Sequence, residues 1–201
     1  MSERFDEAYW EQRYRGHGPG HRREPNPYLV AAVADRAPGV ALDAGCGEGA
    51  EAGWLAARGW RVTAVDIAAT ALRHAREHAT ALGPDVADRI DWVRADLTGW
   101  TPPAQRYDLV CAHYVHPATD GPDLLRRLAA AVAPGGTLLV VGHAPSPANP
   151  AAGATVEEAT AVLDAGRWEV QLAEARSRTA AGHHGHDVTL HDTVVRARRR
   201  P

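Results

Sequence analysis

A glycine-rich turn follows an aspartate at the end of an apolar run, and this combination is typical of a ligand site. The residues are Asp43, Gly45, Gly47 and Gly49, and a helical pattern begins directly after them. Glycine adopts positive φ without strain and lets the backbone approach a ligand closely. The start of a helix offers free backbone N–H groups. The turn therefore predicts a nucleotide-like ligand without saying which one.

One alternative is that the turn binds a dinucleotide. Gly45, Gly47 and Ala50 satisfy the Gly-x-Gly-x-x-Ala fingerprint, and Asp66 lies about where a ribose-binding acid belongs. An NAD-dependent oxidoreductase therefore stays open on this motif alone.

Two other aspartates favour a cationic ligand that carries adenosine. Asp43 precedes the first glycine by two residues, where its carboxylate would repel a pyrophosphate and attract an amino group. Asp96 follows a later apolar run and offers an acceptor suited to an exocyclic amine.

Alternating apolar runs and helical patterns predict the elements that position these residues. Strands are expected at 40–44, 61–65, 90–94, 107–111 and 137–141, and helices at 27–37, 49–58, 68–82, after Asp120 and at 155–163. Two final strands, 168–173 and 188–197, have no helix between them, which predicts an antiparallel addition at one edge. The expected fold is α/β, a Rossmann-like three-layer sandwich with a seven-stranded, mostly parallel sheet and an antiparallel last strand.

The first 24 residues are expected to form a lid over a ligand-binding domain that comprises residues 25–201. Residues 5–15 have helical spacing and an aromatic face that includes Trp10 and Tyr14. Residues 16–23 have no periodicity and are expected to form a mobile loop. The alternative for the helix is that its aromatic side chains only pack against the main domain.

Composition is that of an ordinary globular protein, with 45% apolar and 23% charged residues. The net charge of −3 gives no reason to expect nucleic acid or an anionic membrane as a partner. We find no secretory signal in residues 1–12 and no apolar run of the roughly 20 residues that a membrane span needs. We therefore expect a cytoplasmic protein that is a monomer or a homodimer.

Five motifs in order resemble those of the class I S-adenosylmethionine-dependent methyltransferases. They are 42–49 (LDAGCGEG), Val65-Asp66, Ala95-Asp96-Leu97, 107–110 (YDLV) and 133–136 (APGG). The aromatic segment 9–14 is similar to the small-molecule branch typified by tellurite-resistance and thiopurine methyltransferases. The resemblance implies S-adenosylmethionine as cofactor and in-line transfer of its methyl group to an O, N or S atom of a small-molecule acceptor. A non-catalytic S-adenosylmethionine-binding protein stays open as a further alternative.

The resemblance also implies roles for individual residues. Asp43 would orient the cofactor's ammonium group directly or through water, and Asp66 would accept from the ribose hydroxyls. Asp96 would accept from the adenine amino group. The remaining cofactor-binding residues would be Trp10, Tyr14, Gly45, Cys46, Gly47, Gly49, Ile67, Ala95, Leu97, Ala112 and His113.

A general base is needed only where the acceptor must lose a proton. His113 and His116, with Tyr114 between them, are the candidates, and the alternative is that they only line the pocket. Neither this pair nor the histidines at 183, 184, 186 and 191 has cysteine or carboxylate partners at metal-binding spacing, so no metal is expected. A loop at 176–187 is expected near the substrate entrance. Amino-methylating DNA and RNA enzymes carry Asn/Asp-Pro-Pro-aromatic where this chain has residues 111–114 (CAHY), which disfavours nucleic acid as substrate.

Overall fold

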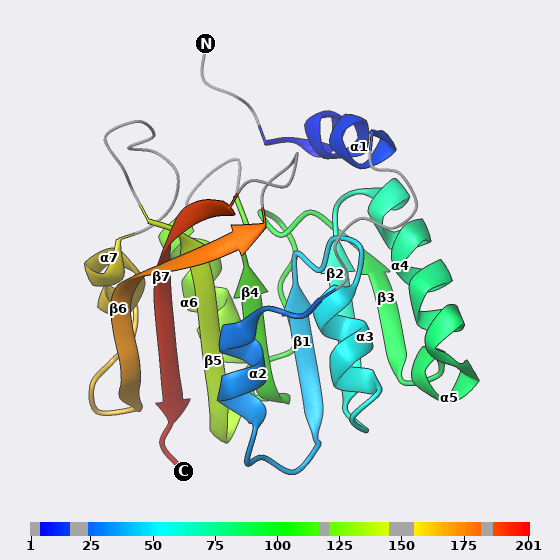
Figure 1. Cartoon of the computed structure of the whole chain (residues 1–201). Coiled ribbons are helices and arrows are strands. Elements are labelled where there is room, and N and C mark those ends of the chain that lie inside the picture. Colours follow the sequence, from blue (N-terminus) through cyan, green and yellow to red (C-terminus); the bar gives the residue numbers. More distant parts are fainter. Residues whose placement is uncertain (1–4, 17–23, 117–120, 145–154, 182–186) are drawn as a thin grey trace.

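A seven-stranded sheet forms the middle layer of the molecule, and helices cover both of its faces (Figure 1). The computed structural model describes residues 5–16, 24–116, 121–144, 155–181 and 187–201. The strand order is β3-β2-β1-β4-β5-β7-β6. β7 pairs antiparallel with β5 and with β6, whereas the other neighbours pair in parallel. The prediction of a Rossmann-like three-layer sandwich with an antiparallel last strand is confirmed.

The strands are β1 (Val40–Ala44), β2 (Arg61–Asp66), β3 (Ile90–Arg94), β4 (Tyr107–His113), β5 (Val132–His143), β6 (Trp168–Ala181) and β7 (Asp187–Arg199). The helices are α1 (Glu7–Arg15), α2 (Pro27–Val33), α3 (Ala50–Ala56), α4 (Ala69–Leu82), α5 (Pro84–Ala87), α6 (Gly121–Ala131) and α7 (Val156–Ala161). Among the described residues, no helix is both long and apolar enough to span a bilayer.

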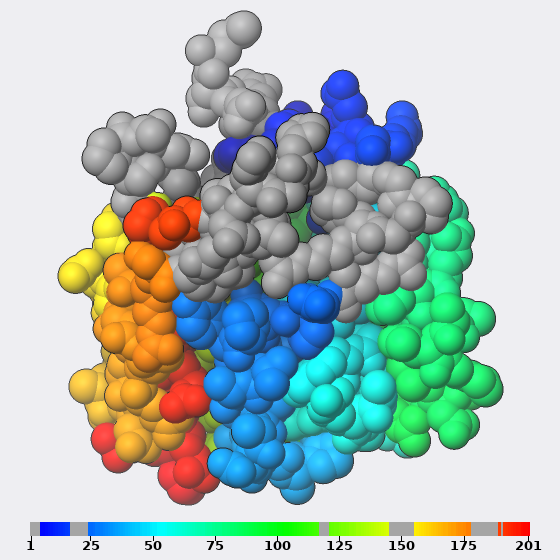
Figure 2. Space-filling model, viewed as in Figure 1, coloured from blue at the N-terminus to red at the C-terminus, as the bar shows by residue number. Residues whose placement is uncertain are grey.

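The central strands are buried on both faces, which explains why they read as apolar runs without alternation. Leu29, Leu55 and Leu72 bring α2, α3 and α4 onto one face, and Leu128 brings α6 onto the other. Burying each leucine stabilises the fold by roughly 1.5–3 kcal/mol. Figure 2 shows α2 and α3 side by side on the face turned to the viewer. The two clusters hold the carboxyl ends of β1, β2 and β4 in fixed positions.

α1 lies beyond the carboxyl ends of the parallel strands, outside the two apolar clusters (Figure 1). None of its residues is fully buried, and polar contacts tie it to the rest of the molecule in addition to the rings of Trp10 and Tyr14. The Glu11 carboxylate accepts from the Thr70 backbone N–H at 3.1 Å and from the Thr70 hydroxyl at 2.6 Å. Glu7 also pairs with Arg94. The expected helix is confirmed, whereas the loop at 17–23 lies outside the described residues and the division at residue 24 stays a prediction.

The expected loop at 176–187 is wrong at both of its ends. β6 continues to Ala181 and β7 begins at Asp187, because the two strands pair with each other along most of their length. The ends of these two strands are rich in polar residues, so the apolar pattern of the sequence does not reveal them. Pairing between the two strands, rather than burial, stabilises them there. Residues 182–186, with three of the expected histidines, lie outside the described part.

Smaller differences concern helix ends. α2 ends at Val33, earlier than expected, and Pro84 begins the short α5 that the sequence analysis did not predict. The capping box of Thr155 and Glu158 is present in α7, with bonds of 2.8 and 3.1 Å. The expected cap at Asp120 lies outside the described residues.

Candidate active site

The glycine turn has the conformation that the sequence predicts. Gly45, Gly47 and Gly49 have φ values of +74°, +51° and +76°. A Cβ atom on Gly45 would lie 2.6 Å from Val115 Cγ2, and one on Gly47 would lie 2.9 Å from the Tyr14 hydroxyl oxygen. Glycine is therefore required both by the backbone and by the side chains that close over the turn.

Asp66 fastens the end of β2 to this turn. Its Oδ2 accepts from the Gly47 backbone N–H at 2.8 Å, and its Oδ1 accepts from the Ala68 backbone N–H at 2.9 Å. Burial raises the pKa of Asp66, and these backbone hydrogen bonds act in the opposite direction. Each carboxylate oxygen has a further lone pair, so the group can still accept hydrogen bonds from a ligand hydroxyl.

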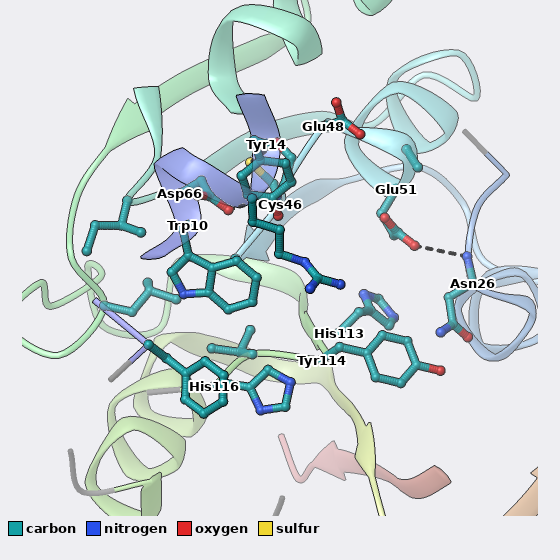
Figure 3. A pocket seen from close by; sticks show the side chains of 18 of the residues that line it. Trp10, Tyr14, Asn26, Cys46, Glu48, Glu51, Asp66, His113, Tyr114 and His116 are labelled. Atoms are coloured by element: carbon teal, nitrogen blue, oxygen red, sulfur yellow. Dashed lines mark hydrogen bonds between the residues drawn. The ribbon is translucent and has the colours of Figure 1, made fainter. Parts of the chain in front are cut away.

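A cavity of about 390 Å³ opens at the carboxyl edge of the sheet, beneath α1 (Figure 3). Its volume falls within the range of about 300–1,000 Å³ that is usual for small-molecule sites. Most of the residues that the sequence analysis assigned to the site line it: Trp10, Tyr14, Gly45, Cys46, Gly47, Asp66, Ile67, Ala95, Asp96, Leu97, His113, Tyr114 and His116.

Three expected site residues do not line the cavity. Asp43 is only 1% exposed and lies inside the sheet, where its Oδ1 accepts from the Cys111 thiol at 3.7 Å. Gly49 lies under the Trp92 ring, and Ala112 is buried in β4. The Asp43 side chain is buried and does not line the cavity, so a direct contact with a ligand stays a prediction. An action through water stays a prediction.

Two glutamates in the cavity wall, Glu51 and Glu48, were not among the expected site residues. Glu51, in the first turn of α3, lines the cavity, and its Oε1 accepts from the Asn26 backbone N–H at 3.0 Å (Figure 3). The pKa of Asp43 lies well above its usual range, chiefly because of burial and then because of the charge of Glu51. Glu48, also in the cavity wall, pairs with His74 at 2.8 Å. Glu48 lies in the glycine turn and Glu51 lies at the start of α3, and these positions in the sequence could have predicted that they line the site.

His113 faces the cavity, but both of its ring nitrogens are buried without a hydrogen-bond partner in the described structure. Burial lowers the pKa of His113, while the charge of Glu51 acts to raise it. Ligand atoms of His113, Asp43 and Cys111 lie within 4.8 Å of one another. Burial holds the pKa of the Cys111 thiol well above its usual range, which disfavours the thiolate that a metal would need. The expectation that the site binds no metal stays a prediction.

A second group of side chains forms a wall of rings after β4 and β5. The His116 ring stacks on Phe5, with centroids 5.0 Å apart, and on His143, with centroids 5.8 Å apart. The centroid of the His143 ring in turn lies 4.6 Å from the centroid of the Tyr114 ring. Tyr114 has a φ of +54°, rare for a residue other than glycine, and such conformations cluster at functional sites.

His143 was missed by the sequence analysis. It is the last residue of β5, whose parallel pairing with β4 brings it to the same edge as His116. The pKa of His116 is lowered by burial, by His143 and by Arg13 on α1. The imidazole of His116 is therefore neutral at neutral pH and available as a proton acceptor.

The chain is similar to proteins described as methyltransferases. Residues 41–136 match a family described as a methyltransferase domain. A trans-aconitate 2-methyltransferase of Paracidovorax citrulli is 37% identical over 123 residues, which cover 59% of this chain and 44% of that protein. The trans-aconitate 2-methyltransferase of Streptomyces avermitilis is 33% identical over 81% of this chain and 60% of its own length. The chain thus spans about half the length of the curated relatives it matches.

A solved structure shows similarity over most of its length. The protein in that structure is described in connection with the conversion of a disulfide bond into a thioacetal group during echinomycin biosynthesis. It is 26% identical, with a TM-score of 0.71, over 96% of this chain and 92% of that one. These similarities favour a methyltransferase over an NAD-dependent oxidoreductase. The narrower resemblance to tellurite-resistance and thiopurine enzymes stays a prediction.

Proposed function

We propose that the chain is a class I S-adenosylmethionine-dependent methyltransferase, which transfers a methyl group from S-adenosylmethionine to a small-molecule acceptor by in-line displacement. One observation carries this proposal. A single cavity has the glycine turn and Asp66 in one wall and the neutral imidazole of His116 in another. The wall with the acids suits the cofactor, and the wall with the rings suits the acceptor.

The residues of the cavity fit this cofactor. The lack of a side chain at Gly47 lets the Tyr14 hydroxyl close over the turn, and Asp66 keeps lone pairs for ribose hydroxyls. Asp96 is exposed in the cavity wall and can accept from the adenine amino group, with Leu97 beside it. When bound, the cofactor supplies an activated methyl group on a positively charged sulfur. Glu51 in the cavity wall provides the negative potential that attracts the ammonium group.

The chain's own part in catalysis is mainly to position the acceptor. Correct orientation contributes up to roughly 7–11 kcal/mol toward lowering a barrier. Where the acceptor must lose a proton, His116 takes it, and a positioned base contributes about 10²–10⁴-fold. His113 and Tyr114 shape the same wall.

α1 serves as a lid in this proposal. Trp10 and Tyr14 line the cavity from above, while Glu11 ties the helix to Thr70 at the start of α4. Residues 1–24 would thus close over a methyltransferase domain formed by residues 25–201. We further propose a cytoplasmic protein, monomer or homodimer, that acts on neither nucleic acid nor membrane.

Ligand binding separates this proposal from its two rivals. S-adenosylmethionine and S-adenosylhomocysteine should raise the Tm, and NADH should not, because a ligand that binds only the native state stabilises it. The reverse ranking would indicate an oxidoreductase. A screen of small acceptors that counts the S-adenosylhomocysteine produced then separates an enzyme from a protein that binds the cofactor without turnover.

A further inference from the structure

The ring wall, which comprises Phe5, Trp10, Tyr114, His116 and His143, brings five rings together in the lining of the cavity. The planes of Phe5 and His143 lie within 27° and 25° of the plane of His116, and the plane of Trp10 lies within 20° of it. Three separate parts of the chain supply these rings, namely the N-terminal segment and the ends of β4 and β5. Parallel rings in a cavity wall favour a ligand that is itself flat.

The charge near this wall is positive. Arg13 lines the cavity, and its guanidinium carbon lies 6.0 Å from the centroid of the Trp10 ring. The charged groups that shift the pKa of His116 are His143 and Arg13, and both lower it.

The acids of the cavity gather at the other end. Asp66 and Glu48 belong to the glycine-turn wall, and Glu51 bonds the backbone of Asn26 opposite α3 (Figure 3). Glu24, another lining residue, lies two positions before Asn26 in the chain. The charges in the cavity are therefore unevenly distributed. Acidic side chains lie beside the expected cofactor, and cationic or basic side chains lie beside the ring wall.

We propose that the methyl acceptor is a flat, conjugated or aromatic anion, such as an aromatic carboxylate. Its plane packs against the ring wall, and its negative charge pairs with Arg13. An arginine guanidinium suits a carboxylate because it donates two parallel hydrogen bonds. The positive charge of the cofactor attracts the same anion from the opposite side. This inference rests on the proposed function and narrows it to one class of acceptor.

Four probes of similar size test the two properties separately. They are benzoate (flat anion), benzamide (flat and neutral), benzylamine (aromatic cation) and cyclohexanecarboxylate (anion without a flat ring). Their Kd values are measured by calorimetry on the full chain saturated with S-adenosylhomocysteine. We expect benzoate to bind about tenfold more tightly than each of the others, the order of effect of one charge-assisted contact or one stacked ring.

Variants of Arg13 and His116 test which residue selects for negative charge and which selects for a flat ring. Arg13→Gln should remove the preference for benzoate over benzamide, whereas Arg15→Gln should keep it, since Arg15 is 73% exposed on the same helix and makes only a 3.8 Å contact with Glu11. His116→Phe should keep the preference for benzoate over cyclohexanecarboxylate because it keeps a flat ring. His116→Ala should lose it, with the Tm recorded to establish that each variant is folded.

The outcomes distinguish a failure of this inference from a failure of the proposed function. Equal affinities for the four probes, tightest binding of benzylamine, or an unchanged charge preference in Arg13→Gln would overturn the inference while leaving the proposed function standing. If S-adenosylhomocysteine does not bind, the proposed function fails. The same titrations on the free protein then still decide whether the ring wall and Arg13 select a flat anion.

Discussion

The carboxylate of Asp66 accepts the backbone N–H of Gly47 at 2.8 Å, although the two residues are 19 positions apart. This bond ties the end of β2 to the turn that follows β1, so the same side chain both shapes the turn and faces the cavity. Loss of the Asp66 carboxylate should consequently affect stability as well as ligand binding.

Asp66→Asn should lower the free energy of unfolding by about 1–3 kcal/mol, because the amide can accept at only one of the two positions. Affinity for S-adenosylhomocysteine should fall at least about tenfold with the loss of a charged acceptor. Urea unfolding and calorimetry measure the two effects. Asp91→Asn, an exposed change on β3, is the control. Unchanged affinity in a folded Asp66→Asn protein would contradict the ribose assignment.

Asp43 should make the free protein less stable as the pH rises. Its pKa is raised in the folded protein, so the folded state holds the proton more tightly than the unfolded state does. The contribution of Asp43 to stability is therefore greatest below the ordinary aspartate pKa of about 3.9 and falls as the pH rises toward the raised value, by about 1.4 kcal/mol per pH unit. Urea unfolding at several pH values above 4 should show this slope.

Asp43→Asn should flatten that dependence, because the amide does not titrate, whereas Asp91→Asn should leave it unchanged. A wild-type protein whose stability is independent of pH across this range would show that Asp43 is not held protonated by burial.

The fold and the position of the site could be predicted because both depend on local patterns. Apolar runs ending in Asp66 and Asp96, and glycines at alternate positions, mark the carboxyl edge of a parallel sheet wherever they occur. The depth of Asp43 could not be predicted in this way. Its burial depends on its register with Ala64 in β2 and Cys111 in β4, which only the assembled sheet defines.

His143 and Arg13 illustrate the other limit of sequence reasoning. Each belongs to an element far from the glycine turn in the chain, and neither was assigned a role: His143 lies in no motif, and in segment 9–14 only Trp10 and Tyr14 were expected in the site. His143 reaches the site because β5 pairs with β4, and Arg13 because Glu11 docks α1 on α4. Tertiary pairing decides both positions, so spacing within the sequence carries no signal for them.

Gly47→Ala should destabilise the turn by about 1–3 kcal/mol, since the residue has a φ of +51° and the new Cβ atom would lie 2.9 Å from the Tyr14 hydroxyl oxygen. Tyr14→Phe removes that oxygen. The double variant should therefore regain part of the loss, leaving the backbone strain. A double-mutant cycle by urea unfolding measures the coupling. Strictly additive effects would show that the Tyr14 hydroxyl does not limit the space above Gly47.

The pKa of His116 should lie below the ordinary histidine value of about 6.5, because burial, His143 and Arg13 all disfavour the charged ring. Arg13→Gln should raise it toward that value, while Arg15→Gln should not. An NMR titration of the histidine side chains measures the pKa of His116 in each protein and needs no methyl acceptor. Once an acceptor is known, the low-pH limb of kcat/KM should shift upward in Arg13→Gln if His116 is the base. A limb that stays in place would leave His116 as a lining residue.

The docking of α1 on α4 should depend on Glu11, since its carboxylate accepts two hydrogen bonds from Thr70 and no residue of this helix is fully buried. The pKa of Glu11 is lowered, chiefly by the hydrogen bond from the Thr70 side chain, so the contact is complete at neutral pH and is lost as the pH falls through the lowered value. Glu11→Gln weakens two hydrogen bonds to Thr70, and about 1 kcal/mol corresponds to roughly fivefold more frequent opening of the helix. Hydrogen exchange of the α1 amides should accelerate by that factor while the β1 amides stay protected. Glu77→Gln, which breaks an exposed ion pair on α4, should leave α1 unchanged. Equal exchange of α1 in wild type and Glu11→Gln would show that Glu11 does not hold the helix over the cavity.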